Sequence, residues 1–196
     1  MKLLLALLLT VPLIAQNDST QFKRKRTIYS SIGVGTAWTG SMVGLASLWY
    51  QDSWGNGFRF FNDGNEWLQM DKVGHAYTGY HIQRNMHNLY QWAGWNQRQS
   101  LLISGLISTG YLTTLEIFDG FSDDWGFSWW DMAANVAGVG LFTAQEVLWE
   151  EQYVKFKFSS SPSPYAKYRP ATLGDSYASR MLKDYNGQTY WLSFHP

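Results

Sequence analysis

Three apolar segments, each with polar groups at one end, are the feature that most constrains the fold of this chain. Asp71 and His75 lie in DKVGHAYTGY, Glu116 closes LLISGLISTGYLTTLE, and Asp131 and Asn135 lie in WWDMAANVAGVG. A spacing of four residues places both members of a pair on one face of a helix. In consecutive antiparallel helices, the start of the first, the end of the second and the start of the third meet. The pattern therefore predicts a helical bundle with a polar cluster at one end.

The apolar runs predict four helices. We expect them over residues 28–50, 72–92, 98–118 and 129–153. Asp71 is well placed as the N-cap of the second helix. The first helix has small residues such as Gly33, Gly40 and Gly44 at intervals that let another helix backbone approach closely. It also lacks charged residues and is long enough to cross a bilayer. The expected fold is all-α, a membrane-associated bundle of four hydrophobic helices.

The two ends of the chain predict different segments. Residues 1–15 combine a basic residue, an apolar run and a small residue before the next polar stretch, as secretory signal peptides do. A polar basic linker over residues 16–27 precedes the helical domain, which we place at residues 28–157. Residues 158–196 form a Ser/Pro-rich linker and an extended tail, in which an Asn-Gly turn signal precedes a β-prone run. We expect this run to be half of a hairpin whose partner strand is missing, as in a truncated chain.

Composition narrows the class of protein. Aromatic residues make up 17% and charged residues 15% of the chain, against about 25% charged in an ordinary soluble domain, which indicates a membrane or a very apolar bundle. The 15 basic and 15 acidic residues cancel, and without a basic stripe we expect no nucleic-acid binding. The sequence contains no cysteine, which excludes disulfides and thiolate sites.

Charge also bears on location. Basic residues, including KRKR at 23–26, collect at one end of the predicted bundle, and acidic residues collect at the end that holds the cluster. The positive-inside rule would place the basic end in the cytoplasm, whereas a cleaved signal peptide would export it. We favour export, to the periplasm or to an envelope membrane, with inner and outer membrane left open.

The blocks DK..H.Y..Y, a glutamate ending a hydrophobic helix, and FSWWDMAAN.AG resemble the VanZ-like group of bacterial envelope proteins. They resemble more closely its YfiM-like branch, labelled predicted periplasmic lipoproteins. The similarity covers about residues 67–150. It implies a small helical envelope protein without a settled activity, and the lack of cysteine departs from the lipoprotein label. The matching positions are Asp71, Lys72, His75, Glu116, Asp131 and Asn135.

Two interpretations of the cluster are non-enzymatic. In a structural network, Lys72 pairs with a carboxylate and His75 hydrogen-bonds Glu116 or Asp131, which fixes the helix register. In a binding pocket, carboxylates and nearby indoles hold a cationic or polyhydroxylated group of an envelope lipid or glycan. The predicted walls of that pocket are Trp125, Trp129 and Trp130.

A third interpretation is a metal-assisted hydrolase acting on a lipid or cell-wall intermediate. A divalent metal would be held by His75 with carboxylates from Asp71, Glu116 or Asp131, and the same four residues are the catalytic candidates. One histidine among carboxylates is a thin ligand set, and no HExxH motif is present. We therefore expect a non-enzymatic structural or ligand-binding protein that needs no cofactor.

Overall fold

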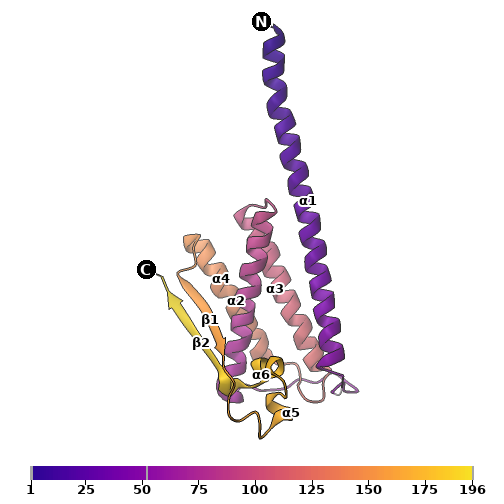
Figure 1. The fold of residues 1–196 in the computed structure, drawn as a ribbon, viewed down its shortest axis with the longest axis vertical. Coiled ribbons are helices and arrows are strands. Elements are labelled where there is room, and N and C mark those ends of the chain that lie inside the picture. Colours follow the sequence, from indigo (N-terminus) through magenta and orange to yellow (C-terminus); the bar gives the residue numbers. More distant parts are fainter. Residues whose placement is uncertain (1, 52, 196) are drawn as a thin grey trace.

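The computed structural model describes residues 2–51 and 53–195, with side chains from residue 19 onward except that of residue 48, and shows a mostly helical chain with one small sheet (Figure 1). The predicted signal peptide precedes the described side chains. The long elements are α1 (Lys2–Leu48), α2 (Met70–Trp92), α3 (Gln97–Gly120), α4 (Trp129–Trp149), β1 (Val154–Ser160) and β2 (Gln188–Phe194). Between the strands lie the short helices α5 (Pro170–Leu173) and α6 (Tyr177–Lys183). The chain is mostly helical, as expected, but the all-α class is not confirmed because β1 and β2 form a sheet.

Three helices, rather than the predicted four, form the core. α2 packs closely against both α3 and α4, whereas α1 lies beside α2 and α3 with few contacts (Figure 1). Glycines allow the close approach of α2 and α4. A Cβ added at Gly138 would overlap the carbonyl oxygen of Ala76, and one at Gly79 would lie 2.6 Å from the carbonyl oxygen of Asn135.

One face of α3 carries small buried hydroxyl residues. Ser100, Ser104 and Ser108 are fully buried, and their small side chains let neighbouring helices approach closely. The hydroxyl of Ser104 donates to the Ser100 carbonyl at 2.6 Å, and that of Ser108 donates to the Ser104 carbonyl at 2.7 Å. The small serine side chains therefore allow close packing of the helices, and the hydroxyls of Ser104 and Ser108 still have hydrogen-bond partners.

The predictions for the first helix are not confirmed. A Cβ added at Gly33, Gly40 or Gly44 would have no described atom within 4 Å, so no described helix packs against these glycines. Among the described residues, α3 is the one helix that is long and apolar enough to cross a membrane, with 22% of its apolar window buried. The segment over residues 28–50 does not meet that measure.

The C-terminal segment corrects two predictions. β1 pairs with β2 in antiparallel register, with Phe156 opposite Leu192, so the partner strand of the β-prone run lies within the chain. α4 ends at Trp149 rather than at residue 153, because Glu150 takes a left-handed conformation with φ 54° and the chain turns into β1. Residues 158–196 thus include ordered structure that packs on α2, where Tyr77 contacts the ring of Phe158.

Candidate functional site

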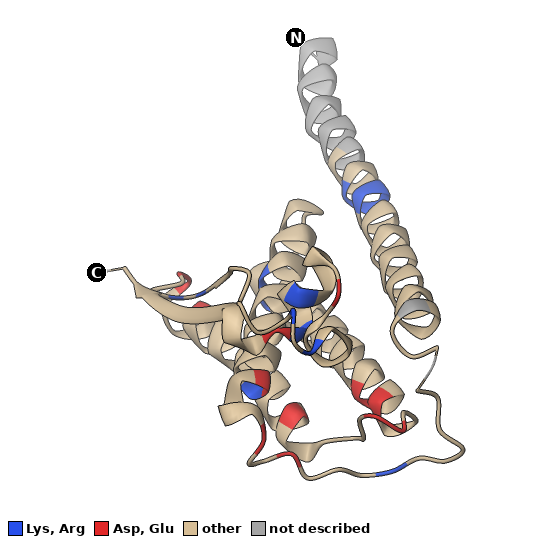
Figure 2. Cartoon of the chain, turned by 60° about the horizontal axis from the view of Figure 1, so that its bottom comes forward, with Lys and Arg blue, Asp and Glu red and all other residues tan. Residues whose placement is uncertain are grey.

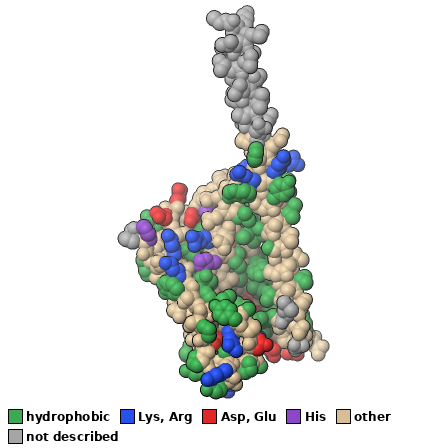
Figure 3. Space-filling model, viewed as in Figure 1, with side chains coloured by type: hydrophobic (Ala, Val, Ile, Leu, Met, Phe, Trp, Pro, Cys, Tyr) green, Lys and Arg blue, Asp and Glu red, His purple; other side chains and the backbone are tan. Residues whose placement is uncertain are grey.

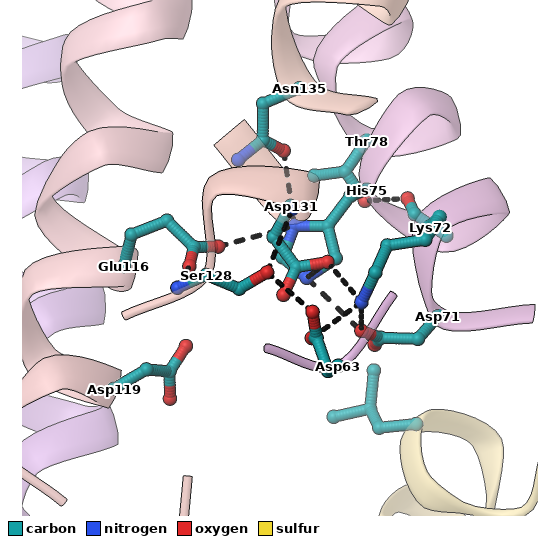
Figure 4. A network of polar contacts seen from close by, with 12 residues as sticks. Asp63, Asp71, Lys72, His75, Thr78, Glu116, Asp119, Ser128, Asp131 and Asn135 are labelled. Carbon is teal, nitrogen blue, oxygen red and sulfur yellow. Dashed lines mark hydrogen bonds and ion pairs between the residues drawn. The ribbon is translucent and has the colours of Figure 1, made fainter. Parts of the chain in front are cut away.

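The polar residues at the helix ends meet in one cluster (Figure 4). Asp71, Lys72 and His75 come from the first turns of α2, Glu116 from the end of α3, and Asp131 and Asn135 from the start of α4. This is the convergence that the antiparallel arrangement predicts, and Figure 2 shows acidic residues gathered at this end. The prediction that Asp71 is the N-cap of α2 is wrong. Gln69 takes the N-cap position, so Asp71 lies in the first turn of the helix.

Lys72 is the centre of the ion pairs. Its Nζ lies 2.5 Å from Asp63 Oδ2, 2.9 Å from Asp71 Oδ2 and 2.7 Å from Asp131 Oδ1, and its side chain is only 11% exposed. Burial alone would lower the pKa of Lys72, but the hydrogen bonds to these carboxylates outweigh burial and raise it. Lys72 is therefore a permanent cation that joins α2, α4 and the loop that carries Asp63.

Asp63 is the member of the cluster that the sequence did not single out as a site residue. It is buried in the loop before α2 and accepts a hydrogen bond from the Ser128 hydroxyl at 2.5 Å. Burial raises its pKa, yet the hydrogen bonds from Lys72 and Ser128 lower it further than burial raises it. Ser128 also caps α4 by accepting from the Asp131 backbone N–H. The loop thereby fixes the start of α4.

His75 lies between the two sides of the cluster. Its Nδ1 is 3.1 Å from Asn135 Oδ1 and 3.5 Å from Glu116 Oε1. Because an amide oxygen only accepts, Nδ1 carries the proton and donates to Asn135. Nε2 lies 3.6 Å from Asp131 Oδ1 and 3.8 Å from Asp71 Oδ1. Nε2 therefore faces both carboxylates.

The buried side of the cluster has an excess of carboxylates. Glu116 is 1% exposed, and burial together with the charges of Asp131 and Asp119 raises its pKa to about 9. Burial and the charge of Asp71 raise the pKa of Asp131 to about 8, against the opposing effect of Lys72. Glu116 Oε1 and Asn135 Nδ2 are buried without a hydrogen-bond partner among the described residues. The cluster therefore retains protons at neutral pH.

A cavity of about 240 Å³ opens on the exposed edge of the cluster. Asp71 and His75, with side chains 23% and 21% exposed, lie in its wall beside Tyr77, Tyr185 and Tyr190. The Tyr185 hydroxyl donates to Asp71 Oδ1 at 2.6 Å. Much of this wall comes from the segment after β1. Sequence reasoning missed it, because it treated that segment as a linker and tail.

The tryptophans predicted to wall the site lie elsewhere. Trp129 and Trp130 are exposed and line a separate hollow with Phe60, Phe61 and Asn62. Trp130 Nε1 donates to Asn62 Oδ1 at 3.1 Å, and the Trp129 ring stacks on Phe60. Neither indole lines the cavity beside Asp71. Tyrosines take the place that the sequence pattern assigns to tryptophans.

Three of the four candidate metal ligands lie close together. Asp71, His75 and Asp131 each offer a ligand atom, and these atoms lie within 4.8 Å of one another. Glu116, the fourth candidate, does not belong to this group. Lys72 Nζ already contacts two of the three groups, so a metal ion would compete with an ammonium for the same carboxylates.

The fold and the cluster define a small, mostly helical domain closed by a two-stranded sheet. Residues 57–146 match the model of a family described as "Predicted periplasmic lipoprotein (DUF2279)". The matched residues contain the whole ion-pair cluster and end before β1. The match supports the resemblance to predicted periplasmic lipoproteins, while the relation to VanZ-like proteins stays a prediction. No curated protein and no solved structure gives a significant match.

Proposed function

We propose that this chain is a non-enzymatic protein of the bacterial cell envelope that binds a small cationic or polyhydroxylated group of an envelope lipid or glycan. The description of the matched family and the predicted signal peptide both support export to the periplasm or envelope. The binding site would be the cavity beside Asp71. The ion-pair network around Lys72 would hold the helices and the loop that shape it.

The observation that carries this proposal is the exposure of Asp71 and His75 in a tyrosine-walled cavity. The rest of the cluster is more deeply buried, whereas these two polar groups reach the cavity. Aromatic faces next to a carboxylate suit ammonium groups and the C–H faces of sugars. Burial raises the pKa of Tyr190 to about 12, with smaller contributions from Tyr77 and Asp71. Its hydroxyl therefore stays protonated; it donates to Gln188 Oε1 at 3.1 Å, and its oxygen can still accept a hydrogen bond from a ligand.

The position of Lys72 supports a non-enzymatic site. A metal ion at this site would have to lie between the carboxylates. The Lys72 ammonium already occupies that position, with contacts to Asp63, Asp71 and Asp131. Such buried networks hold a register between elements. The carboxylates that could activate water are instead engaged with a permanent charge.

Binding can be measured by calorimetry with two probes, ethanolamine for a cation and N-acetylglucosamine for a polyhydroxylated group. We expect saturable binding of one probe, weakened about tenfold in Asp71→Asn, which corresponds to about 1.4 kcal/mol. Glu151→Gln removes an exposed carboxylate outside the cavity and serves as the matched control. The proposal fails if neither probe binds saturably, or if both variants bind as the parent does.

The alternative is a metal-assisted hydrolase acting on a lipid or cell-wall intermediate, favoured by the grouping of Asp71, His75 and Asp131. Elemental analysis of the purified full chain after incubation with zinc would decide between the two. A stoichiometric ion that is lost in His75→Ala would support the hydrolase. A folded protein that retains no stoichiometric ion would exclude it.

A further inference from the structure

A second hollow, far more apolar than the cavity beside Asp71, separates α1 from α2 and α3. It has a volume of about 780 Å³ and is lined by side chains of all three helices. Apolar side chains face this hollow below the basic side chains of α1 (Figure 3). Its walls include Val34, Trp38, Ile82, Met86 and Ile107. We call it the α1 groove.

Polar contacts hold α1 at both ends of this groove. Near one end, Trp95 Nε1 donates to Thr27 Oγ1 at 2.9 Å, and near the other the Tyr111 hydroxyl donates to Ser41 Oγ at 3.2 Å. Between these two contacts Ser31 Oγ lies 3.3 Å from the Tyr90 hydroxyl, but the helices still leave open space, since Gly33 lines the groove and a Cβ there would meet no described atom within 4 Å. The groove is therefore a consequence of how α1 contacts the other helices.

Positive charge lies at one mouth of the α1 groove. The Arg26 guanidinium is 4.7 Å from the ring centroid of Trp92, a lining residue, and Arg26 Nη1 donates to the Trp92 carbonyl at 3.2 Å. Lys23 and Arg26 precede Ser30 by seven and four residues and so share its face of α1, and Ser30 lines the groove. Arg24 and Lys25 point to other faces of the helix by the same periodicity.

We propose that the α1 groove binds an acyl chain of one anionic phospholipid, with the phosphate held by Lys23 and Arg26. The apolar walls would remove the chain from water. The paired cations would form charge-assisted hydrogen bonds with the phosphate. The positive charge at the mouth favours an anionic amphiphile, rather than a second apolar helix, as the occupant of the groove. The α1 groove and the cavity beside Asp71 share Thr78 in their walls, but Gly33 lines only the groove and Asp71 only the cavity, so variants at these two positions test the two proposals independently.

The test uses the purified full chain and monomeric short-chain phosphatidylglycerol with brominated acyl chains, which quench the fluorescence of groove tryptophans. We expect saturable quenching at one lipid per chain. Gly33→Leu, which fills the groove, should weaken binding at least about tenfold, whereas Gly35→Leu, also in open space but outside the lining, should not. Circular dichroism melts check that both variants fold.

The second part of the test examines the role of charge and compares two double variants of equal net charge. Lys23→Gln with Arg26→Gln should weaken binding about tenfold, and Arg24→Gln with Lys25→Gln should leave it unchanged. Equal losses in both would show non-specific attraction to the basic segment and overturn the proposal. Equal affinity for brominated phosphatidylcholine would also overturn it. So would a dimer, seen by light scattering, that dissociates in Gly33→Leu, because a second copy would then occupy the groove.

Discussion

Replacing Lys72 by Met tests the central role given to this lysine. Met has a similar length and no charge, so the change leaves Asp63, Asp71 and Asp131 without the ammonium that lies 2.5–2.9 Å from each. Removing one partner from a buried ion pair costs about 3–5 kcal/mol. We expect about 3 kcal/mol, because the partly exposed Asp71 can regain water. For a chain of this size that corresponds to a fall in Tm of roughly 6–12 °C.

The pH dependence of this loss provides a second signature. Burial raises the pKa values of Asp63 and Asp71, but other groups lower them further: Lys72 and Ser128 at Asp63, and His75, Tyr185 and Lys72 at Asp71. A carboxylate with a lowered folded-state pKa stabilises the protein above its unfolded pKa of about 4, and that contribution disappears as the pH falls through the folded-state pKa. Without Lys72 the carboxylates gain protons more readily, so the difference from the parent should be smaller at pH 4 than at pH 7.

The assay is urea unfolding of the parent and variant chains, followed by circular dichroism at both pH values. Lys157→Met, in the exposed part of β1, is the matched control and should change the free energy of unfolding by less than about 0.5 kcal/mol. A loss of under about 1 kcal/mol for Lys72→Met would equal that of an exposed pair. The network would then not hold the helices together, and our reasoning would be wrong.

Two further predictions follow from buried groups. Glu116 keeps its proton up to about pH 9 in the folded state, whereas an unfolded glutamate releases it near pH 4.3. Between these pH values the folded state binds more protons than the unfolded state. The free energy of unfolding therefore falls with rising pH, by up to about 1.4 kcal/mol per pH unit. Glu116→Gln should therefore raise the free energy of urea unfolding at pH 8 more than at pH 5. Gly138→Ala should lower the Tm by overpacking worth about 1–3 kcal/mol, whereas exposed Gly140→Ala, with open space around its Cβ, should raise stability by up to about 1 kcal/mol.

Each of these has a defined contrary result. An equal effect of Glu116→Gln at both pH values would mean that the parent glutamate is ionised in the folded state. Equal melting temperatures for Gly138→Ala and Gly140→Ala would mean that α2 and α4 do not approach as closely as the Ala76 contact requires.

Local sequence patterns determined the helices and the polar end of the core. Repeats of three and four residues fix which side chains share a helix face, so the sequence alone pairs Asp131 with Asn135. The order of three antiparallel helices then places Asp71, His75 and Glu116 together. These inferences hold because they depend on spacing within a helix and on short connections.

Only the tertiary structure decided which partners complete the site. Asp63 reaches Lys72 from a loop and Tyr185 reaches Asp71 from 114 residues away, and no local pattern encodes contacts of that range. The pairing of β1 with β2 also joins residues far apart in the sequence, which is why local patterns predict no strand where β1 lies. The α1 groove likewise arises from contacts of Thr27 and Ser41 with residues distant in the sequence, at the two ends of the groove. A stripe of small residues permits close packing, but only the attachment of the helix decides whether another helix fills the space.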